Sequence, residues 1–550
     1  MRRAPALRTD TVSCAPVVRG SPRWSIKLPL GMGPERGWLV RALAGLALIL
    51  ALASTSLARA EASYRSIDEL QQAMAKGQLS SEALVHYYLD RIEALDRQGP
   101  NLHALIAVNP DALDQARALD QERREHGPRG PLHGIPIVVK DNIETQDRMP
   151  TTAGSYALAS NFAQHDAPVI AALRAAGAVI LGKANLSEWA DFRSSRATSG
   201  WSAVGGLTRN PYVLDRTPCG SSSGSAVAVA VDLAAASVGT ETDGSITCPA
   251  SMDGIVGLKP TVGLLSQQGI VPVAHSQDTA GPMGRSVADV ALLLTAMVGS
   301  TDYTKALDPN ALQGKRIGVL RFQPGKYPQL DIVYARALDR LKDAGATLVE
   351  VTAPDVAPIW AAETKVLLTE FKVDIDQYLG GLSPAVKVRS LSQLIAYDRS
   401  SLYELELFGQ DTFLQADTTT GLDDPTYRAA LARARQLAAT DGIDRLLRES
   451  RLDLLVAPTT TPAWRVDILF GDRNTDASTT LPAVAGYPHL SVPMGVVRGL
   501  PVGLSFIGPA RSEALLLACG YAFSMRSPAL EPPTFVPSLE ALEFRPDQGP

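Results

Sequence analysis

The sequence predicts an α/β fold: a single large, mixed and mostly parallel β-sheet with helices on both faces. Helical segments alternate with short buried strands along most of the chain, which is the pattern of a sheet covered by helices. Glycines stand where a helix gives way to a strand, as Gly177 does in "DAPVIAALRAAGAVILGKAN" and Gly345 in "IVYARALDRLKDAGATLVEV". We find no internal repeat and no long linker, so we expect one large domain.

The first helices are marked by their capping residues. Ser66 and Glu69 have the spacing of a capping box and predict a helix start. A second helix is expected after Ser81, because Leu84, Tyr88 and further apolar residues recur at helical spacing.

Strands and helices then alternate. Residues 135–139 predict a buried strand that ends on Lys140, and "AVILGK" predicts the next, after a helix with Asp166 as its cap and Pro168 in its first turn. "KRIGVL" and "LDLLVAP" predict further buried strands, and "HLSVPMG" and "LPVGLSFIG" predict a return to the same sheet. Residues 353–480 are more helical, with loops expected at "QDTFLQADTTTGLDD" and "FGDRNTDASTT".

Residues 1–60 are expected to be a signal peptide rather than part of the fold. "ALAGLALILALA" is twelve small and apolar residues long, which suits a signal-peptide core and is short for a membrane span of about 20. "LARA" predicts cleavage after Ala60, and Met32 is a possible true start. We therefore expect an exported protein, periplasmic or secreted, with no stable membrane association after cleavage. An uncleaved membrane anchor is the alternative.

Charge and cysteine content exclude several functions. The net charge of −5 becomes −12 once the +7 of residues 1–60 is set aside, so we expect no nucleic-acid partner. Cys219, Cys248 and Cys519 remain, too few for a disulfide framework; Cys219 and Cys248 could pair, although nothing local demands it. No Cys or His spacing resembles a zinc site.

Lys140 raises the first question about chemistry, because it ends the apolar run "GIPIVVKDNI". A lysine at a strand end is most simply a charge at the point where the strand surfaces. The alternative is a catalytic amine, because desolvation lowers the pKa of a buried lysine. Asp141 and Asn142, directly behind it, either orient the amine or satisfy the turn.

A segment rich in serine, glycine and small apolar residues, 219–261, offers two kinds of nucleophile. Gly220 to Gly224 match the G-x-S-x-G nucleophile elbow, centred on Ser222. That mechanism needs a downstream histidine, and His275 and His489 have no telling context. A serine activated by a neutral lysine, through a second serine, needs no histidine.

The second option coincides with a resemblance. "GIPIVVKDNI", "GSSSGSA" and "GTETDGSI…GIVGLKPT" resemble the motifs of the amidase signature family, in the same order. Ser221 and Ser245 lie 24 residues apart, as do the family's relay serine and nucleophile. Further matches, such as "VILGKANLSEWA" and "GYPHLSVPMG", extend the resemblance over residues 65–525.

The resemblance implies the site. Lys140 would be the general base, Ser221 the relay, after a cis peptide bond to Gly220, and Ser245 the nucleophile that forms an acyl-enzyme. It implies an oxyanion hole made of the backbone N–H groups of Thr242, Asp243, Gly244 and Ser245. It implies no metal and no cofactor.

Some residues depart from the family pattern. Glu241 stands where an aspartate is usual, Asp243 where a glycine is usual, Thr247 where an arginine is common and Cys219 where a glycine is common. The Asp243 carboxylate must therefore point away from the developing oxyanion. "GTETDGSI", "SQDTAGPM" and "LFGQD" resemble the branch of peptide amidases, which remove C-terminal amides from peptides.

The expected function is therefore hydrolysis of linear carboxamides, C-terminal peptide amides first, with a small-molecule or short peptide amide as substrate. Hydrolysis of simple aliphatic or aryl amides, a part in an ammonia-generating amidotransferase and a non-catalytic binding role are the alternatives. The specificity-forming region is expected at 353–480 of a 61–550 catalytic domain. The remaining conspicuous side chains are expected to be structural, or to line a pocket in the aromatic case: Ser222, Ser223, Ser225, Lys183, Lys259, Trp189, Phe192 and Trp201.

Overall fold

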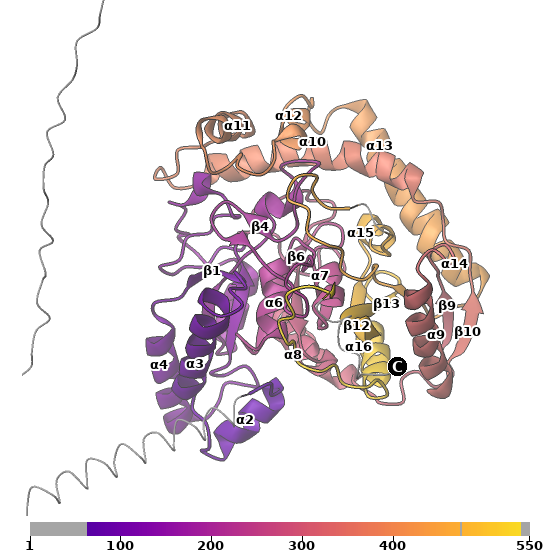
Figure 1. Cartoon of the computed structure of the whole chain (residues 1–550), viewed down its shortest axis with the longest axis horizontal. Helices are drawn as coiled ribbons and strands as arrows, with labels where there is room; N and C mark the ends of the chain where they lie inside the picture. The colour runs from indigo at the N-terminus through magenta and orange to yellow at the C-terminus, as the bar shows by residue number, and fades with distance from the viewer. Residues whose placement is uncertain (1–62, 474–475, 541–550) are drawn as a thin grey trace, which may run out of the picture. The chain divides into compact units, whose positions relative to one another are not determined.

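An 11-stranded sheet runs through the part of the chain that the computed structural model describes, residues 63–473 and 476–540. The expected signal peptide lies outside these residues. The strand order is β1-β3-β2-β6-β8-β7-β12-β13-β11-β9-β10, with β1 at one edge and β10 at the other (Figure 1). The strands are β1 Leu105–Val108, β2 Pro136–Lys140, β3 Val179–Ala184, β6 Ala236–Glu241, β7 Val256–Lys259, β8 Thr279–Gly284, β9 Arg316–Val319, β10 Thr347–Glu350, β11 Leu454–Pro458, β12 His489–Val497 and β13 Leu500–Ile507, with β4 Trp201–Ser202 and β5 Gly206–Leu207 as a separate pair.

The sheet is mixed, as predicted, but its parallel pairs are confined to two places. β2 pairs in parallel with β3 and β6, and β9 pairs in parallel with β10 and β11. The strands between these groups, from β6 through β8, β7, β12 and β13 to β11, are antiparallel to their neighbours. "Mostly parallel" therefore describes the two flanks and not the centre. For β12 and β13 the reason is that their connection is a tight turn at Arg498 and Gly499, which reverses the chain.

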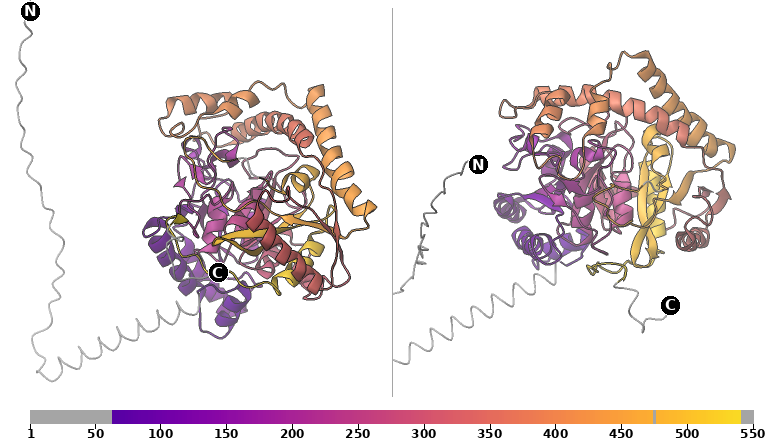
Figure 2. Two further views of the ribbon diagram at one scale, coloured as in Figure 1. Left: turned by 45° about the vertical axis from the view of Figure 1, so that its right-hand side comes forward. Right: turned by 45° about the horizontal axis from the view of Figure 1, so that its top comes forward.

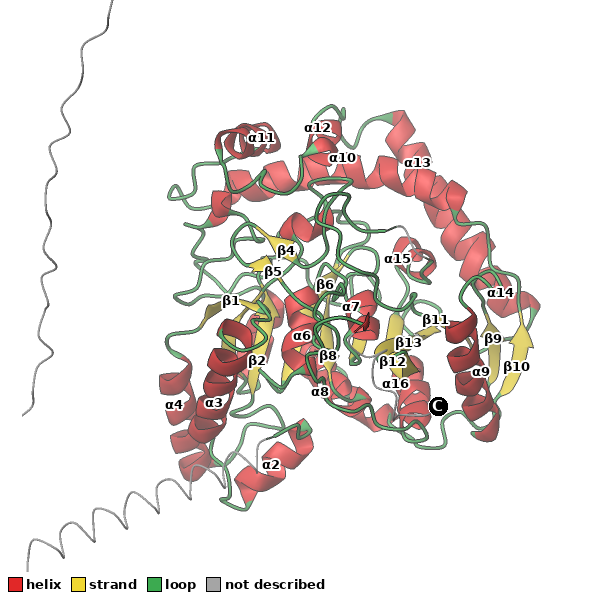
Figure 3. Cartoon of the chain, viewed as in Figure 1, coloured by secondary structure: helices red, strands yellow, loops and turns green. Residues whose placement is uncertain are grey.

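Helices surround the sheet (Figure 3). The α-helices are α2 Ile67–Ala75, α3 Ser81–Arg91, α4 Ala112–His126, α5 Pro168–Ala175, α6 Ser223–Ala230, α7 Thr247–Met252, α8 Val287–Val298, α9 Pro328–Asp343, α10 Ala357–Gly381, α11 Leu391–Ser400, α12 Asp411–Ala416, α13 Pro425–Arg435, α14 Asp444–Glu449, α15 Thr480–Ala485 and α16 Glu513–Ser524. Short 3-10 or π segments are η1 Ile92–Arg97, η2 Tyr156–Leu158, η3 Glu188–Asp191, η4 Tyr303–Ala306 and η5 Gln436–Ile443. No helix within the described ranges is long and apolar enough to cross a membrane.

Helices cover both faces of the sheet, as β11 makes clear. Leu454 and Val456 belong to the large core that also contains residues of α5, α8, α9 and α16. Leu455 and Ala457 belong to a second core with residues of η5, α14 and α15. Because successive strand side chains point to opposite faces, the two cores lie on opposite sides of the sheet. The expected two-sided α/β architecture is confirmed.

The region 353–480 is mainly helical, as expected, with α10 to α14 along one end of the sheet (Figures 1 and 2). α10 packs through Phe371 and Ile375 into a core shared with Val271 and Ala274 of the segment between β7 and β8. The expected loop at 410–424 contains a helix, α12, because Phe413 anchors it in that core at full burial.

The early elements follow their sequence signals closely. Ser66 and Glu69 form the capping box of α2, and Pro168 begins α5. The prediction of Asp166 as the cap of α5 is wrong. Ala167 is the N-cap residue, and the Asp166 carboxylate instead accepts hydrogen bonds from Gln146 N and Arg174 Nε.

Candidate active site

β2 carries Lys140 into the interior, where its side chain is fully buried. Nζ donates hydrogen bonds to Ser221 Oγ at 2.7 Å, to Thr240 Oγ1 at 2.9 Å and to Thr240 O at 3.2 Å. The strand does not surface at Lys140, so the simple reading of a solvent-facing charge is wrong. The lysine ends β2, the middle strand of the parallel group β3-β2-β6, beside the end of β6.

Burial lowers the pKa of Lys140 from its ordinary 10.5 to about 7, because desolvation disfavours the ammonium form. The negative charges of Asp191, Asp278 and Glu241 oppose this shift. An amine with a pKa near 7 is partly neutral at physiological pH, which is the form that can accept a proton.

Asn142 and Asp141, whose roles the sequence left open, do different things. Asn142 Nδ2 donates to Thr240 Oγ1 at 2.9 Å, the same hydroxyl that Lys140 contacts, so Asn142 positions the partner of the amine. Asp141 Oδ2 accepts a hydrogen bond from Thr152 N at 3.1 Å and shapes the turn after β2. Burial raises the pKa of Asp141 to about 6.

The loop before α6 presents Ser221 to the amine. The Gly220–Ser221 peptide bond is cis, as the family resemblance implied. Residue 220 has to be glycine, because a Cβ there would lie 2.2 Å from Ser187 Oγ and 2.9 Å from Asp191 Oδ2. This close approach brings the Asp191 carboxylate against the loop that carries Ser221.

The other hydroxyls of this loop are engaged with backbone. Ser222 Oγ donates to Thr240 O at 3.0 Å, Ser223 Oγ donates to Cys219 O at 2.6 Å and Ser225 Oγ lies 3.4 Å from Val238 O. Their predicted structural role is consistent with these contacts. Ser222 also joins the two serine loops, because its N–H donates to Ser245 O at 3.0 Å.

The turn from β6 to α7 carries Ser245 and the expected oxyanion hole. Within the described residues, the N–H groups of residues 242–245 donate to no protein acceptor. The next two N–H groups, of Ile246 and Thr247, donate to Glu241 Oε2 at 2.7 and 2.9 Å. Glu241, in place of the usual aspartate, thus binds the start of α7 and leaves four successive N–H groups available.

The Asp243 carboxylate is held on the side of α15. Its Oδ2 accepts a hydrogen bond from Thr480 Oγ1 at 2.9 Å, and the same hydroxyl accepts from Trp360 Nε1 of α10 at 2.9 Å. Burial raises the pKa of Asp243 to about 6. This arrangement agrees with the requirement that the carboxylate avoid the oxyanion.

Cys219 and Cys248 form a disulfide with a Cα–Cα distance of 6.0 Å. Cys219 precedes Ser221 by two residues and Cys248 follows Ser245 by three, so the disulfide ties the two serine loops together. The sequence left this pairing open, because only the fold brings the two loops side by side.

The nucleophile-elbow alternative does not match the structure. His275 Nδ1 lies 2.9 Å from Asp374 Oδ2, and His489 Nε2 contacts Ser505 Oγ. Neither histidine contacts Ser222, so that serine has no base of the expected kind. Burial lowers the pKa of His489 to about 3.

Lys183 and Lys259 are buried, and their amines make contacts that fit the structural role predicted for them. Lys183 Nζ donates to Thr151 Oγ1 at 2.7 Å and lies 3.9 Å from Asp141 Oδ1. Lys259 Nζ donates to Pro260 O at 3.2 Å, and its pKa falls to about 8 through burial.

Lys140 therefore contacts Ser221 directly. Ser245 is connected to the loop of Ser221 through its carbonyl oxygen, which accepts a hydrogen bond from the N–H of Ser222. Among the described residues, the Ser245 hydroxyl has no hydrogen-bond partner, and the side chain is nearly buried. Sequence reasoning missed Thr240 and Asp191. Thr240 stands inside the recognised "GTETDGS" motif, which could have drawn attention to it, whereas nothing local marks Asp191.

The conspicuous aromatic residues pack into the fold. Trp189 and Phe413 meet edge to face, Phe192 packs against Phe371, and Trp201 packs against Phe408.

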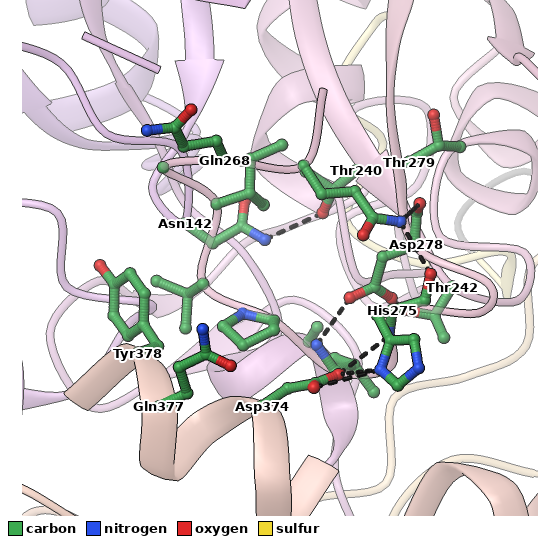
Figure 4. A pocket seen from close by; sticks show the side chains of 17 residues that line it. Asn142, Thr240, Thr242, Gln268, His275, Asp278, Thr279, Asp374, Gln377 and Tyr378 are labelled. Atoms are coloured by element: carbon green, nitrogen blue, oxygen red, sulfur yellow. Dashed lines mark hydrogen bonds and ion pairs between the residues drawn. The ribbon is translucent and has the colours of Figure 1, made fainter. Parts of the chain in front are cut away.

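A cavity of about 310 Å³ lies beside Thr240, a hydrogen-bond partner of Lys140 (Figure 4). Its lining includes Asn142, Thr240 and Thr242, together with residues of the β7–β8 segment and of α10 such as His275, Asp278, Asp374, Gln377 and Tyr378.

Known proteins are similar to this chain over most of its length. The Amidase family profile matches residues 83–517. A probable amidase of Arabidopsis thaliana is 38% identical over 519 residues, covering 89% of this chain and 96% of the relative. One component of the glutamyl-tRNA(Gln) amidotransferase of a Synechococcus strain is 35% identical over 500 residues, covering 86% of this chain and 94% of that relative.

Solved structures give the same result. The native peptide amidase from Stenotrophomonas maltophilia is 49% identical with a TM-score of 0.82, covering 86% of this chain and 99% of that chain. A peptide amidase in complex with the competitive inhibitor chymostatin is 49% identical with a TM-score of 0.83, at the same coverage. The chain therefore belongs to the amidase signature family and is an amide hydrolase.

Proposed function

We propose that Lys140, Ser221 and Ser245 form a Ser-Ser-Lys triad that hydrolyses the C-terminal amide of short peptides through an acyl-enzyme. The observation that carries the proposal is the 2.7 Å contact between Lys140 Nζ and Ser221 Oγ, with the amine fully buried. A buried amine with a pKa near 7 serves as a general base at neutral pH.

In the proposed mechanism, neutral Lys140 accepts the proton of Ser221, and Ser221 accepts the proton of Ser245. The Ser245 oxygen then attacks the amide carbonyl carbon and forms a tetrahedral intermediate. The proton returns along the same path to the leaving nitrogen, the C–N bond breaks and ammonia departs. Water, activated by the same relay, then hydrolyses the acyl-enzyme.

The oxyanion of the intermediate would be bound by the N–H groups of residues 242–245, which have no acceptor among the described residues. Loss of one oxyanion-hole donor in a related arrangement costs about 3–4 kcal/mol of transition-state stabilisation. Thr480 supports the hole indirectly, because it holds the Asp243 carboxylate through Oδ2.

We expect peptide amides to be better substrates than simple amides, because the chain is 49% identical to a peptide amidase and covers 99% of that protein's chain. α10, from the region expected to set specificity, contributes Asp374, Gln377 and Tyr378 to the cavity beside the site. These side chains offer hydrogen-bonding groups to the backbone of a peptide, whereas a simple aliphatic amide has no such groups beyond its reacting amide.

We also propose that the protein is exported after cleavage at Ala60, on the strength of the apolar run and the small-residue site in the sequence. The mass of the mature N-terminus, measured on protein from the extracytoplasmic fraction, tests this. A mature chain that begins before residue 61 would refute the cleavage site, and an uncleaved chain in the membrane fraction would favour an anchor.

The central experiment measures ammonia release by purified protein from a C-terminally amidated dipeptide, a simple aliphatic amide and free glutamine. A higher kcat/KM for the dipeptide amide supports the proposal. Preference for the aliphatic amide would leave a general amidase, and preference for glutamine would favour an amidotransferase-like role. Ser245→Ala should abolish turnover, whereas Ser222→Ala should retain it if folded; the reverse would refute the triad.

A further inference from the structure

A group of three potential metal ligands lies at the edge of the cavity beside the site. Glu370 and Asp374 are one helical turn apart on α10, and His275 faces them from the segment between β7 and β8. His275 Nδ1 lies 2.9 Å from Asp374 Oδ2 and 3.6 Å from Glu370 Oε2. Figure 4 shows the His275 imidazole beside the Asp374 carboxylate.

The spacing of these atoms suits a shared ion. One ligand atom from each residue lies within 4.8 Å of the other two. Zinc ligands at about 2.0–2.2 Å in a tetrahedral arrangement are separated from one another by about 3.4 Å. The two measured separations from Nδ1 are therefore close to the value that a tetrahedral zinc ion requires, before any side chain adjusts.

The charges also favour a cation. Among the described ion pairs, His275 is the only basic partner of Glu370 and Asp374. The Glu370 side chain is fully buried and that of Asp374 is 14% exposed, so solvent screens their charge weakly, while the 44% exposed imidazole gives an entry route.

The residue next to His275 carries a buried hydroxyl that lacks a hydrogen-bond partner. Ser276 Oγ is buried and has no hydrogen-bond partner among the described residues, although Ser276 N donates to Glu370 Oε2 at 3.0 Å. Buried hydroxyls without partners are uncommon, because the lost hydrogen bond costs free energy. The cavity that His275 and Asp374 line gives room for water molecules to complete a coordination shell.

We propose that His275, Glu370 and Asp374 bind a divalent transition-metal ion, zinc first, at a site separate from the catalytic serines. Imidazole nitrogen and carboxylate oxygen are ligands that zinc accepts together. Binding replaces the Nδ1 proton with the metal ion, and that proton leaves to solvent. The ion acts on structure and takes no part in amide cleavage.

The position of the site means that a bound ion would connect two elements of the fold near the expected oxyanion hole. It joins α10 to the β7–β8 segment, in which Asp278 Oδ1 accepts a hydrogen bond from Thr242 Oγ1 at 2.6 Å. Gln277 Nε2 in the same segment donates to Glu363 of α10 at 2.8 Å. A metal ion that fixes these two elements would stabilise the fold next to the expected oxyanion hole.

The test uses purified tag-free protein freed of metal with a chelator and then exchanged into chelator-free buffer. Titration calorimetry with Zn²⁺ should show one site per chain, and saturating Zn²⁺ should raise the midpoint of thermal unfolding by about 2 °C or more. His275→Ala and Asp374→Asn should each weaken binding by at least about tenfold. His126→Ala, which removes an exposed histidine of α4, is the matched control and should bind as the unaltered protein does.

A far-ultraviolet circular dichroism spectrum like that of the unaltered protein, with cooperative thermal unfolding, shows that each metal-free variant is folded. Co²⁺ supplies a second readout, because coordination by nitrogen and oxygen gives visible d–d absorption that His275→Ala should remove. The proposal is overturned if Zn²⁺ neither binds nor shifts the unfolding midpoint. It is equally overturned if folded His275→Ala and Asp374→Asn bind Zn²⁺ as the unaltered protein does.

Discussion

The pH dependence of hydrolysis tests the role of Lys140 most directly. With the ordinary pKa of 10.5, only roughly 3 in 10,000 lysine side chains would be neutral at pH 7. With the pKa near 7 that burial produces, about half are neutral. The buried position thus raises the amount of competent base at neutral pH by about a thousandfold.

The expected profile follows from the sign of this shift. The neutral amine is the active form, so kcat/KM should rise with pH, with an apparent pKa near 7. At pH 5, about 1% of the amine is neutral, and kcat/KM should fall to about that fraction of its plateau. Initial rates with the amidated dipeptide between pH 5 and 9 measure this pH profile of kcat/KM. A rate that is constant from pH 5 to 8 would refute the lysine base.

Asp191 allows a sharper version of this test. Its charge raises the pKa of Lys140, and its own pKa is raised to about 7 by burial. Asp191→Asn removes that charge, so the acid limb of the profile should move to lower pH. An unmoved limb, or a shift to higher pH, would contradict the electrostatic account.

Lys140→Met separates catalysis from folding. The variant should be inactive, because no base remains, but it should fold. Replacing a buried charge by an apolar chain of similar length removes a desolvation cost, so we expect equal or greater stability, by up to about 4 kcal/mol. Urea unfolding at pH 7 measures this. Retained turnover in Lys140→Met would refute the proposed mechanism.

Three further predictions concern the surroundings of the site. Replacing Cys219 and Cys248 together by serine should lower the free energy of unfolding by about 3–4 kcal/mol, because the disulfide closes a loop over a separation of 29 residues; an unchanged urea midpoint would contradict this. Thr480→Val should release the Asp243 carboxylate and lower kcat by about tenfold or more, with Thr480→Ser as the control that keeps the hydroxyl. Phe371→Ala, at a fully buried position of α10 stacked on Phe413, should cost about 3–5 kcal/mol in thermal or urea unfolding; a loss below about 1 kcal/mol would mean that this helical region packs loosely.

The sequence by itself determined the architecture and pointed to the residues that we propose for the site. Buried strands, glycine breaks and capping residues are local patterns, so β2, α2 and the return of β12 and β13 could be predicted from short stretches. Lys140, Ser221 and Ser245 were found because the family motifs and their spacing are also local properties of the chain.

Tertiary structure decided what depends on residues far apart in the chain. The direction of the central strands follows from connections that the alternation of helices and strands does not reveal. The Cys219–Cys248 pairing needed both serine loops in place. His275 and Glu370 are separated by more than 90 residues, so no sequence spacing could bring them together as the ligands of the proposed metal site.

The pKa of Lys140 belongs to the same category. The sequence placed the lysine at a strand end, which equally fits a solvent-exposed charge. Only the packing of β6, the serine loop and Asn142 around it shows that the amine is desolvated. Desolvation is a property of the whole surroundings of an atom, and those surroundings are assembled from distant segments by the fold.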